Sequence, residues 1–263
     1  MKRKLAIMLC MLMSVGVTAC GSSSSSSTQP TPSANEENNA EADAEEAEAE
    51  EPEGESVSSG DSTAWEVGEG KVVTWTDSIG SGWVQIIVPV TNTGTDNLYL
   101  STGTMDLEDE TGHLVDSRSM VSVYPDVIQP GETAFYYEET TLEIEENTTL
   151  KVVPHVEVSK AKVDCIRYDV SDLTLKDEEY GGIALTGRVE NTTEEEGSMV
   201  YVTALLYGSG NEPLAQAFTI LDKNLAAGDK IGFSASTFSV PDSVTMDAVD
   251  HYEVFAYPTQ FQF

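Results

Sequence analysis

The 263-residue sequence has few basic residues and few cysteines, and its longest apolar run is short. It carries 13 Lys and Arg against 46 Asp and Glu, which gives a formal net charge of -33. Such a charge disfavours nucleic acid and anionic lipid surfaces as partners, because both repel a strongly negative protein. Cationic partners and divalent ions stay open, although diffuse acidity also serves to keep a protein in solution.

The apolar run covers residues 5–13 and is too short for a membrane-spanning helix, which needs about 20 apolar residues. Three basic residues, at positions 2–4, precede it, and small residues interrupt it from position 14 onward. A basic start followed by a short apolar run is typical of an export signal. Its removal would take the net charge from -33 to -36, because the three basic residues leave with it.

The next four residues, 17–20, read Val-Thr-Ala-Cys. This order is similar to the lipobox of bacterial lipoproteins. The resemblance implies a signal peptide of residues 1–19 with cleavage after Ala19, a diacylglyceryl group on Cys20, and attachment to the extracytoplasmic side of the cell membrane. Two or three acyl chains on one cysteine give a stable anchor. The alternative is an ordinary signal peptide that is cut nearby, with Cys20 incidental.

Cysteine is scarce enough to exclude a disulfide framework. Of the three cysteines, Cys10 leaves with the signal and Cys20 carries lipid, so that Cys165 alone remains. Stability must then come from hydrophobic cores. Cys165 lies in a strand-like stretch where a small, half-buried residue is expected. A redox-active or intermolecular thiol is the alternative, but no cluster of basic residues beyond Arg167 lies nearby to support it.

Residues 20–63 are predicted to be a disordered linker. Residues 21–60 hold eleven acids and no Lys or Arg, and residues 35–55 alternate Glu with Ala. Like charges three and four residues apart repel one another, and no apolar stripe is present for a helix to bury. About forty flexible residues reach roughly 35 Å. The expected role is a spacer, and the alternative is an acidic recognition tail.

From about residue 61, short runs of Val, Ile, Leu, Tyr and Thr alternate with Gly, Asn, Asp and Pro. This alternation of strand-forming runs with turn-forming residues predicts an all-β fold of sandwiches. A weak internal repeat aligns residues 84–93 with residues 183–192. Both segments end in Asn-Thr, a turn in which the Asn side chain can bond its own backbone. The apolar residues that coincide, expected to form one buried face, are Val84, Ile86 and Val90 in one copy and Ile183, Leu185 and Val189 in the other.

The alignment continues through a hairpin, a turn and a closing strand. The aligned pairs are 105–112 with 204–211, 128–132 with 225–229, and 150–154 with 252–256. The repeat predicts two domains, residues 64–160 and 161–263, each large enough to bury its own core.

The aligned hairpins resemble those of FxLYD and related immunoglobulin-like domains, which occur in tandem in lipoproteins of Gram-positive bacteria. Leu107 and Asp109 keep the Leu and Asp of that signature in the first copy, and Leu206 and Tyr207 keep its Leu and Tyr in the second. The turn at residues 128–132 is also similar to one in that family. The resemblance implies two tandem immunoglobulin-like β-sandwiches and no established reaction. The positions that depart from the signature are Met105, Glu108, Ala204 and Gly208.

No catalytic, cofactor or metal motif stands out. The three histidines, His113, His155 and His251, lie on separate segments without metal-ligand spacing. Residues 106–112 resemble a calcium loop, but the Gly is one place late and the bidentate Glu is missing. Weak calcium binding stays open there and at the acidic runs 145–147, 177–179 and 194–196.

Aromatic residues suggest one possible contact site. Three tryptophans and an aromatic run at residues 135–137 could form a platform for a sugar ring, although core burial is the more common role for a tryptophan in a sandwich. Trp83 directly follows Gly80-Ser81-Gly82, and we expect it to be an exposed ligand contact.

The sequence therefore predicts a membrane-anchored, surface-exposed lipoprotein that acts as a non-enzymatic binding or spacer module of the cell envelope, without cofactor or metal. Its partners would be the membrane, through the lipid, and an envelope protein or glycan, with no role for nucleic acid. The alternatives are an accessory enzyme that processes envelope polysaccharide or peptidoglycan, and a solute-binding component of a transporter, which predicts α/β lobes. The oligomeric state stays open.

Overall fold

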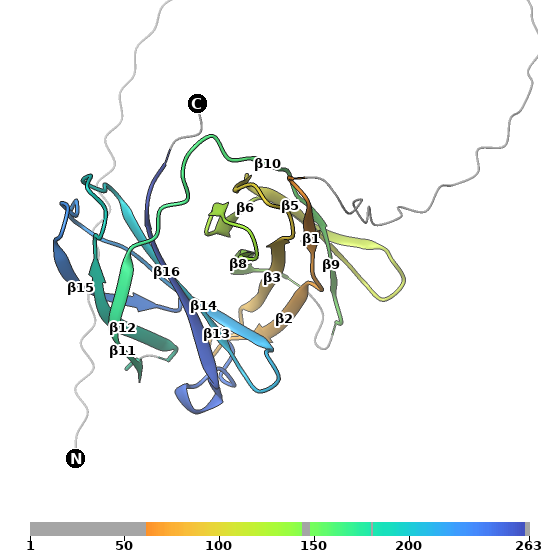
Figure 1. Ribbon diagram of the computed structural model, residues 1–263. Helices are drawn as coiled ribbons and strands as arrows, with labels where there is room; N and C mark the ends of the chain where they lie inside the picture. The colour runs from red at the N-terminus through yellow and green to blue at the C-terminus, as the bar shows by residue number, and fades with distance from the viewer. Residues whose placement is uncertain (1–61, 144–147, 180, 261–263) are drawn as a thin grey trace, which may run out of the picture. The chain divides into compact units, whose positions relative to one another are not determined.

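The computed structural model describes residues 62–143, 148–179 and 181–260 (Figure 1). These residues form antiparallel strands, and the one helix among them is a short 3-10 turn, η1 (Met246–Ala248). The predicted all-β fold is confirmed. The predicted signal peptide, Ala19, Cys20 and all but the end of the predicted linker lie outside the described residues. No helix within the described ranges is long and apolar enough to span a membrane.

The first sandwich holds ten strands in two sheets, with orders β1-β3-β8-β6-β5-β9 and β10-β4-β7, while β2 pairs with β3. Strand β6 connects two layers, since residues 122–124 pair with β8 and residues 114–121 with β5. The strands are β1 (Trp65–Val67), β2 (Lys71–Thr76), β3 (Gly82–Asn92), β4 (Leu98–Leu100), β5 (Gly103–Glu108), β6 (Leu114–Tyr124), β7 (Val127–Ile128), β8 (Thr133–Thr141), β9 (Lys151–His155) and β10 (Val158–Lys160).

The second sandwich is a six-stranded sheet of order β11-β12-β15-β14-β13-β16. Strands β14 and β15 share one pair, Phe218 with Ser236, so the sheet opens there into two layers. The strands are β11 (Asp169–Asp177), β12 (Ile183–Glu190), β13 (Val200–Tyr207), β14 (Pro213–Ile220), β15 (Lys230–Ser236) and β16 (His251–Pro258).

The two sandwiches repeat one topology. Replacing β2, β3, β8, β6, β5 and β9 in order by β11, β12, β15, β14, β13 and β16 converts the first path into the second. The predicted repeat is thus confirmed, and the apolar faces of β3 and β12 that it aligned are buried in both copies.

A buried asparagine closes the same turn in each copy. The Asn92 side-chain amide donates to the carbonyls of Asp96 and Ile128, at 2.9 and 3.2 Å. Asn191 donates in the same way to two carbonyls, at 2.7 and 2.8 Å. Each side-chain oxygen accepts the backbone N–H two residues later, which confirms the predicted local turn. Neither asparagine is more than 1% exposed, so these bonds satisfy groups that water does not reach.

The closing strand departs from the sequence alignment. Val152 of β9 faces Leu107, and Tyr252 of β16 faces Leu206. Since Leu107 and Leu206 are equivalent, Val152 matches Tyr252, whereas the sequence alignment matched residue 150 with it. The prediction was wrong by two residues. A shift of two keeps every side chain on its face, so hydrophobic alternation could not reveal it.

Each sandwich has its own hydrophobic core, and a third apolar cluster joins them. The first core draws on residues 65–158 and the second on residues 166–256. The third contains Ile87, Phe135 and Tyr137 of the first sandwich with Leu205 and Tyr207 of the second. Contacts place both sandwiches in one compact unit. The division into domains at residues 64–160 and 161–263 stays a prediction.

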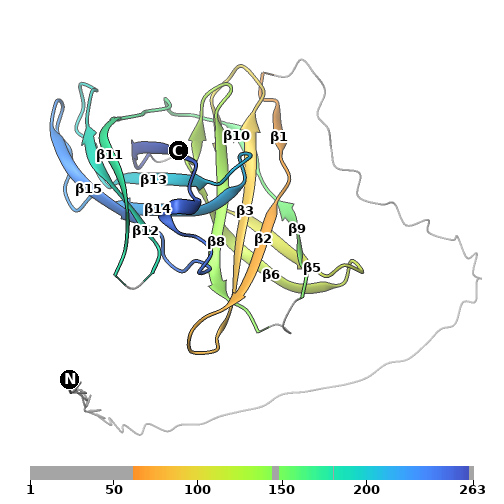
Figure 2. The same ribbon diagram turned by 90° about the horizontal axis from the view of Figure 1, so that it is seen from below.

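The third cluster makes strands β3 and β13 buried on both faces. Along β3, Val84, Ile86 and Val88 face the core while Gln85 and Ile87 are buried on the opposite side. Strand β13 behaves alike, with residues 202–207 buried in succession. Both strands have the nearly continuous apolar sequence of a strand that is covered on two sides. Figure 2 shows β13 and β14 beside β8 and β3.

Candidate functional site

The contact between the sandwiches contains a buried polar cluster beside its apolar part. Gln85 donates from its amide nitrogen to the Tyr137 hydroxyl at 2.9 Å and to Glu139 at 3.3 Å. Tyr137 donates a short hydrogen bond to Glu139. The other Glu139 oxygen accepts the backbone N–H of Ser239, which belongs to the second sandwich, at 3.1 Å. Within the described residues, the Gln85 side-chain oxygen is buried without a partner.

Burial sets the titration of this cluster. It raises the pKa of the Glu139 carboxyl, and the hydrogen bonds from Tyr137, Ser239 and Gln85 offset part of that rise. The pKa of the Tyr137 phenol is also raised, first by burial and then by the Glu139 charge. The cluster lies inside the contact, so it ties the sandwiches together.

A groove of about 940 Å³ opens at one edge of this contact. Its first wall comes from the starts of β2 and β9 and from β3 and β8, and its second from the β13–β14 turn and the start of β16. This volume lies at the upper end of the usual range for ligand sites. The packing explains where the groove lies. The second sandwich covers only part of β3 and β8, and the groove begins where this cover ends.

Three aromatic rings form a ladder in the groove. Phe135 meets Tyr207 edge to face at 6.3 Å between centroids, and Tyr207 stacks on His251 at 4.7 Å with 6° between the planes. The Tyr207 hydroxyl donates to Glu253 at 3.0 Å. Burial raises the pKa of this phenol, and the Glu253 carboxylate raises it further. His251 ends the ladder with its side chain 41% exposed.

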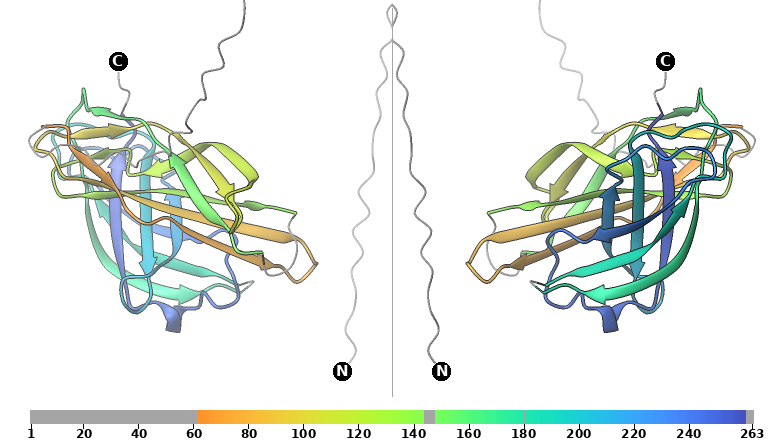
Figure 3. Two further views of the ribbon diagram at one scale, coloured as in Figure 1. Left: turned by 90° about the vertical axis from the view of Figure 1, so that its right-hand side faces the viewer. Right: turned by 90° about the vertical axis from the view of Figure 1, so that its left-hand side faces the viewer.

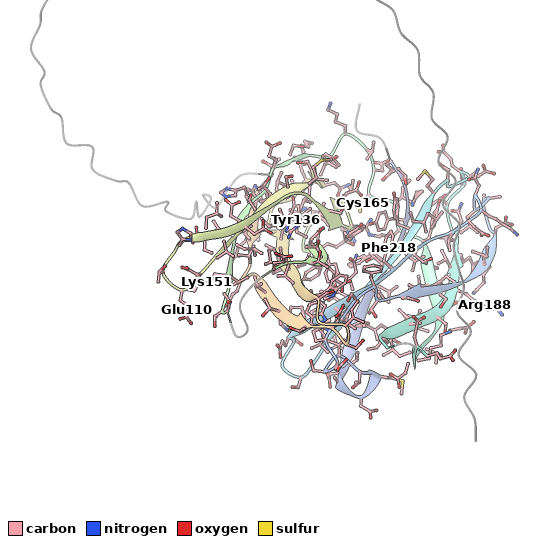
Figure 4. All side chains as sticks on the ribbon, turned by 180° about the vertical axis from the view of Figure 1, so that it is seen from behind. Glu110, Tyr136, Lys151, Cys165, Arg188 and Phe218 are labelled. Atoms are coloured by element: carbon pink, nitrogen blue, oxygen red, sulfur yellow. The ribbon has the colours of Figure 1, made fainter. Side chains whose placement is uncertain are left out.

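The charged groups of the groove nearly balance, with two lysines against three glutamates. Lys71 reaches across it and donates to Glu212 and to the Pro213 carbonyl, each at 2.7 Å, and its hydrogen bond lowers the pKa of Glu212. The remaining charges are Glu69, Glu253 and Lys151 (Figure 4), besides any proton on His251. Lys151 is exposed and has no ion pair within the described ranges. In a chain of net charge -33, this is a locally near-neutral surface.

Trp83 lies outside the groove and is half-buried rather than fully exposed. It stacks on Trp75 across the β2–β3 pair at 6.0 Å and meets Phe238 edge to face at 6.2 Å. Its indole N–H donates to Asp77 at 3.0 Å, which fixes the hairpin between β2 and β3, drawn in orange in Figure 3. One ring face and the N–H are therefore occupied. A role for Trp83 as a ligand contact stays a prediction. The Phe238 ring beside it is exposed.

Cys165 is half-buried in the segment between β10 and β11 that connects the sandwiches, and this segment is irregular rather than the predicted strand. Burial raises the pKa of its thiol to about 11, although Arg167 acts in the opposite direction. Little thiolate is present at neutral pH, and the thiolate is the reactive form. Arg167 itself is bound to Glu132 at 2.8 Å and to the Val127 carbonyl at 2.6 Å.

The histidines and acidic loops do not converge. His155 lies 3.0 Å from Asp106, whereas His251 belongs to the groove and His113 to the β5–β6 hairpin. Asp109 accepts three hydrogen bonds from the Thr111 backbone and hydroxyl and the His113 backbone, so it closes that hairpin. Across the described part of the chain, no three His, Cys, Asp or Glu residues come close enough to hold a metal ion. The acidic run 145–147 lies outside the described residues.

No family model and no curated protein matches the chain, so the comparisons assign no function to this groove. Lys71 was not singled out from the sequence, Tyr207 was named there only for the hairpin resemblance, and His251 only as a histidine without metal-ligand spacing. The one signal for the groove was the nearly continuous apolar run of β13, which ends at Tyr207 and predicts a second covered face.

Proposed function

We propose that this protein is a lipid-anchored lipoprotein of the cell envelope whose packed sandwiches bind an envelope glycan in the groove, without catalysing a reaction. The observation that carries the proposal is the aromatic ladder of Phe135, Tyr207 and His251 in an open groove whose charges nearly balance. The membrane attachment rests on the lipobox at residues 17–20.

A glycan suits this groove because its rings offer apolar faces and its hydroxyls need many weak polar partners. The exposed end of the ladder, at His251, gives a flat surface for stacking. Lys151, Glu69 and Asn211 supply donors and acceptors along the rim. Neutral ligands are favoured over polyanions, because the chain as a whole is strongly acidic.

The groove can be tested by titrating the purified protein with neutral cell-wall oligosaccharides in calorimetry. His251→Ala removes the stacking surface and should weaken binding about fivefold, since one stacked ring contributes on the order of 1 kcal/mol. Lys151→Ala should weaken it about threefold. The matched control is Lys176→Ala, on an exposed position of β11 away from the groove. Equal binding by all four proteins, or none by the wild type, would contradict the proposal.

The anchor needs a separate test, because Cys20 lies outside the described residues. Cys20→Ala should move the protein from the membrane fraction to the medium or periplasm while its thermal unfolding midpoint stays unchanged. Metabolic labelling with a clickable fatty acid should mark the wild type and not the variant. Unchanged membrane retention, with no label on the wild type, would show that residues 17–20 are not a lipobox.

A second candidate function has one observation in its favour. The groove contains three carboxylates, from Glu69, Glu212 and Glu253, and glycoside hydrolysis uses a pair of them. Glu212 is engaged by Lys71 and Glu253 by Tyr207, which favours binding over turnover. Release of reducing ends from cell-wall glycan by the wild type and not by Glu253→Gln would replace the binding proposal with an accessory enzyme. The transporter alternative predicts α/β lobes, which the described all-β residues do not form.

A further inference from the structure

A second pocket, of about 210 Å³, lies at the other end of β13 and is separate from the groove. Four tyrosines line it, two from each sandwich, and we call it the tyrosine pocket. The tyrosines are Tyr99 of β4, Tyr124 of β6, Tyr201 of β13 and Tyr257 of β16. Hydroxyls of Thr102, Ser122 and Thr259 and the carboxyl of Asp126 complete the polar part of the lining.

The rings of this region form a continuous aromatic wall across the contact between the sandwiches. Tyr201 stacks on Tyr257 at 5.8 Å with 24° between the planes. Phe218 lies 5.6 Å from Tyr201 and 5.2 Å from Tyr124, which belongs to the first sandwich. Figure 4 labels Phe218 in this region. Because the rings hold one another, the wall is preorganised and a ligand would meet little rearrangement.

The charge of the tyrosine pocket is of one sign. Asp126 is the one ionisable acid in the lining, and no described lining residue is Lys or Arg. Burial raises the pKa of the Asp126 carboxyl. The nearest guanidinium, of Arg167, lies over the Phe255 and Tyr257 rings at 5.4 and 5.6 Å and is already bound to Glu132. This guanidinium occupies one side of Tyr257 outside the pocket lining and also lowers the pKa of Asp126, which offsets part of the effect of burial.

The phenols of the pocket are neutral beside the carboxyl. Burial raises the pKa of Tyr257 well above its usual range and Asp126 raises it further, while Arg167 acts in the opposite direction. The Asp126 carboxylate would attract a bound cation and repel an anion.

We propose that the tyrosine pocket binds a small organic cation with a quaternary ammonium group, of the choline type. Aromatic rings together with one carboxylate are the chemistry that recognises such cations. The volume has room for about seven water-sized groups at roughly 30 Å³ each, which suits a choline cation. A primary ammonium is more strongly hydrated and loses more on leaving water, so the ring-rich lining favours the quaternary group. The acidic chain raises the local concentration of cations.

The test is calorimetric titration of the full chain with choline chloride. The matched ligand control is 3,3-dimethylbutan-1-ol, which has the shape of choline with carbon in place of the charged nitrogen. Choline should bind saturably, and the neutral alcohol should bind at least about tenfold more weakly if the charge contributes as it does in cation–π sites. Ethanolamine, a primary ammonium of similar length, should also bind more weakly. Equal binding of choline and the neutral alcohol, or no saturable choline binding, would overturn the proposal.

Variants separate the rings from the hydroxyls. Tyr201→Leu removes a ring and should weaken choline binding about tenfold, whereas Tyr201→Phe keeps the ring and should change it by less than about threefold. Asp126→Asn should weaken binding about tenfold by removing the charge. Tyr207→Phe, in the groove, is the matched control and should leave it unchanged. If Tyr201→Leu fails to fold, Tyr99→Leu, on a half-exposed position, replaces it.

Further titrations distinguish the sources of the ammonium group. Phosphocholine reports a headgroup released from, or displayed on, a phosphate polymer, and phosphatidylcholine vesicles report a membrane lipid. A free or polymer-bound source predicts binding of choline and phosphocholine but not of vesicles. A lipid source predicts vesicle binding that excess choline displaces. Loss of binding in Tyr207→Phe together with no effect in Tyr201→Leu would place the ligand in the groove and contradict the proposal.

Discussion

The two sandwiches have the same strand order, but their equivalent outer faces differ. The face is apolar and buried in the first sandwich and polar in the second. In the first, Ile87 pairs with Tyr137 on the outer face of β3 and β8, and both are buried under the second sandwich. The equivalent pair in the second is Thr186, which is half-buried, with Ser234, which is exposed. Arg188, beside them on β12, also points to the outside of the second sandwich (Figure 4).

This difference shows where the two copies have diverged. Alternation constrains the inner face of each strand, because those residues must fill a core. The outer face is free to become a contact in one copy and a polar surface in the other. The groove and the tyrosine pocket are both lined by residues from the two sandwiches, so both candidate sites depend on the contact that this divergence made possible.

The largest expected effect comes from removing the apolar contact between the sandwiches. Ile87→Ala should lower the free energy of unfolding by about 3 kcal/mol, because a fully buried side chain leaves a cavity in a packed interface. The matched change in the other copy, Thr186→Ala, should cost less than about 0.5 kcal/mol. Urea unfolding monitored by tryptophan fluorescence measures both. Similar losses at the two positions would mean that their environments do not differ.

The next effect tests the feature that the copies share. Asn92→Ala and Asn191→Ala each remove two hydrogen bonds donated to backbone carbonyls and one accepted from a backbone N–H, which should cost about 2–3 kcal/mol in either case. Circular dichroism during thermal unfolding measures the losses. Equal losses would support equivalent roles for the two turns. A loss confined to one variant would show that the shared geometry is not a shared source of stability.

The smallest effect concerns the polar cluster, which has no counterpart in the second sandwich. Glu139→Gln should stabilise the protein by about 1 kcal/mol at pH 8, because the variant lacks a charge that burial opposes. The gain should therefore be smaller at pH 4, where the wild-type carboxyl is protonated in both states.

The sign of this pH dependence follows from the raised pKa. The folded protein holds the Glu139 proton more tightly than the unfolded chain, whose ordinary pKa is 4.5. Stability from this group is therefore full below 4.5 and declines as pH rises through the raised folded pKa. Thermal midpoints of wild type and Glu139→Gln, measured from pH 4 to pH 8, should diverge with rising pH. Parallel curves would contradict the assignment.

Much of the arrangement of strands and turns could be predicted from the sequence, because it depends on the local pattern of residues. The alternation at Val84, Ile86 and Val90 predicts one buried face, and the Asn-Thr pairs predict the turns that Asn92 and Asn191 close. Alternation cannot detect a shift of two residues, which is why the closing strand was misaligned at residue 150.

The candidate sites were harder to predict, because they depend on contacts between residues far apart in the chain. Lys71 reaches Glu212, 141 residues away, and Phe135 meets Tyr207 through a packing that no local pattern encodes. Trp83 illustrates the same point, since the preceding Gly80-Ser81-Gly82 predicts exposure but Trp75 and Phe238 cover part of its ring.

By itself the sequence determined an all-β fold, a repeated strand pattern and an acidic surface, since each follows from residue type and spacing along the chain. The tertiary structure decided which outer face is covered. It thereby decided where the groove and the tyrosine pocket lie, because a cleft exists only where two packed surfaces diverge. The physical reason is that alternation specifies which side chains leave the core but not what they meet outside it.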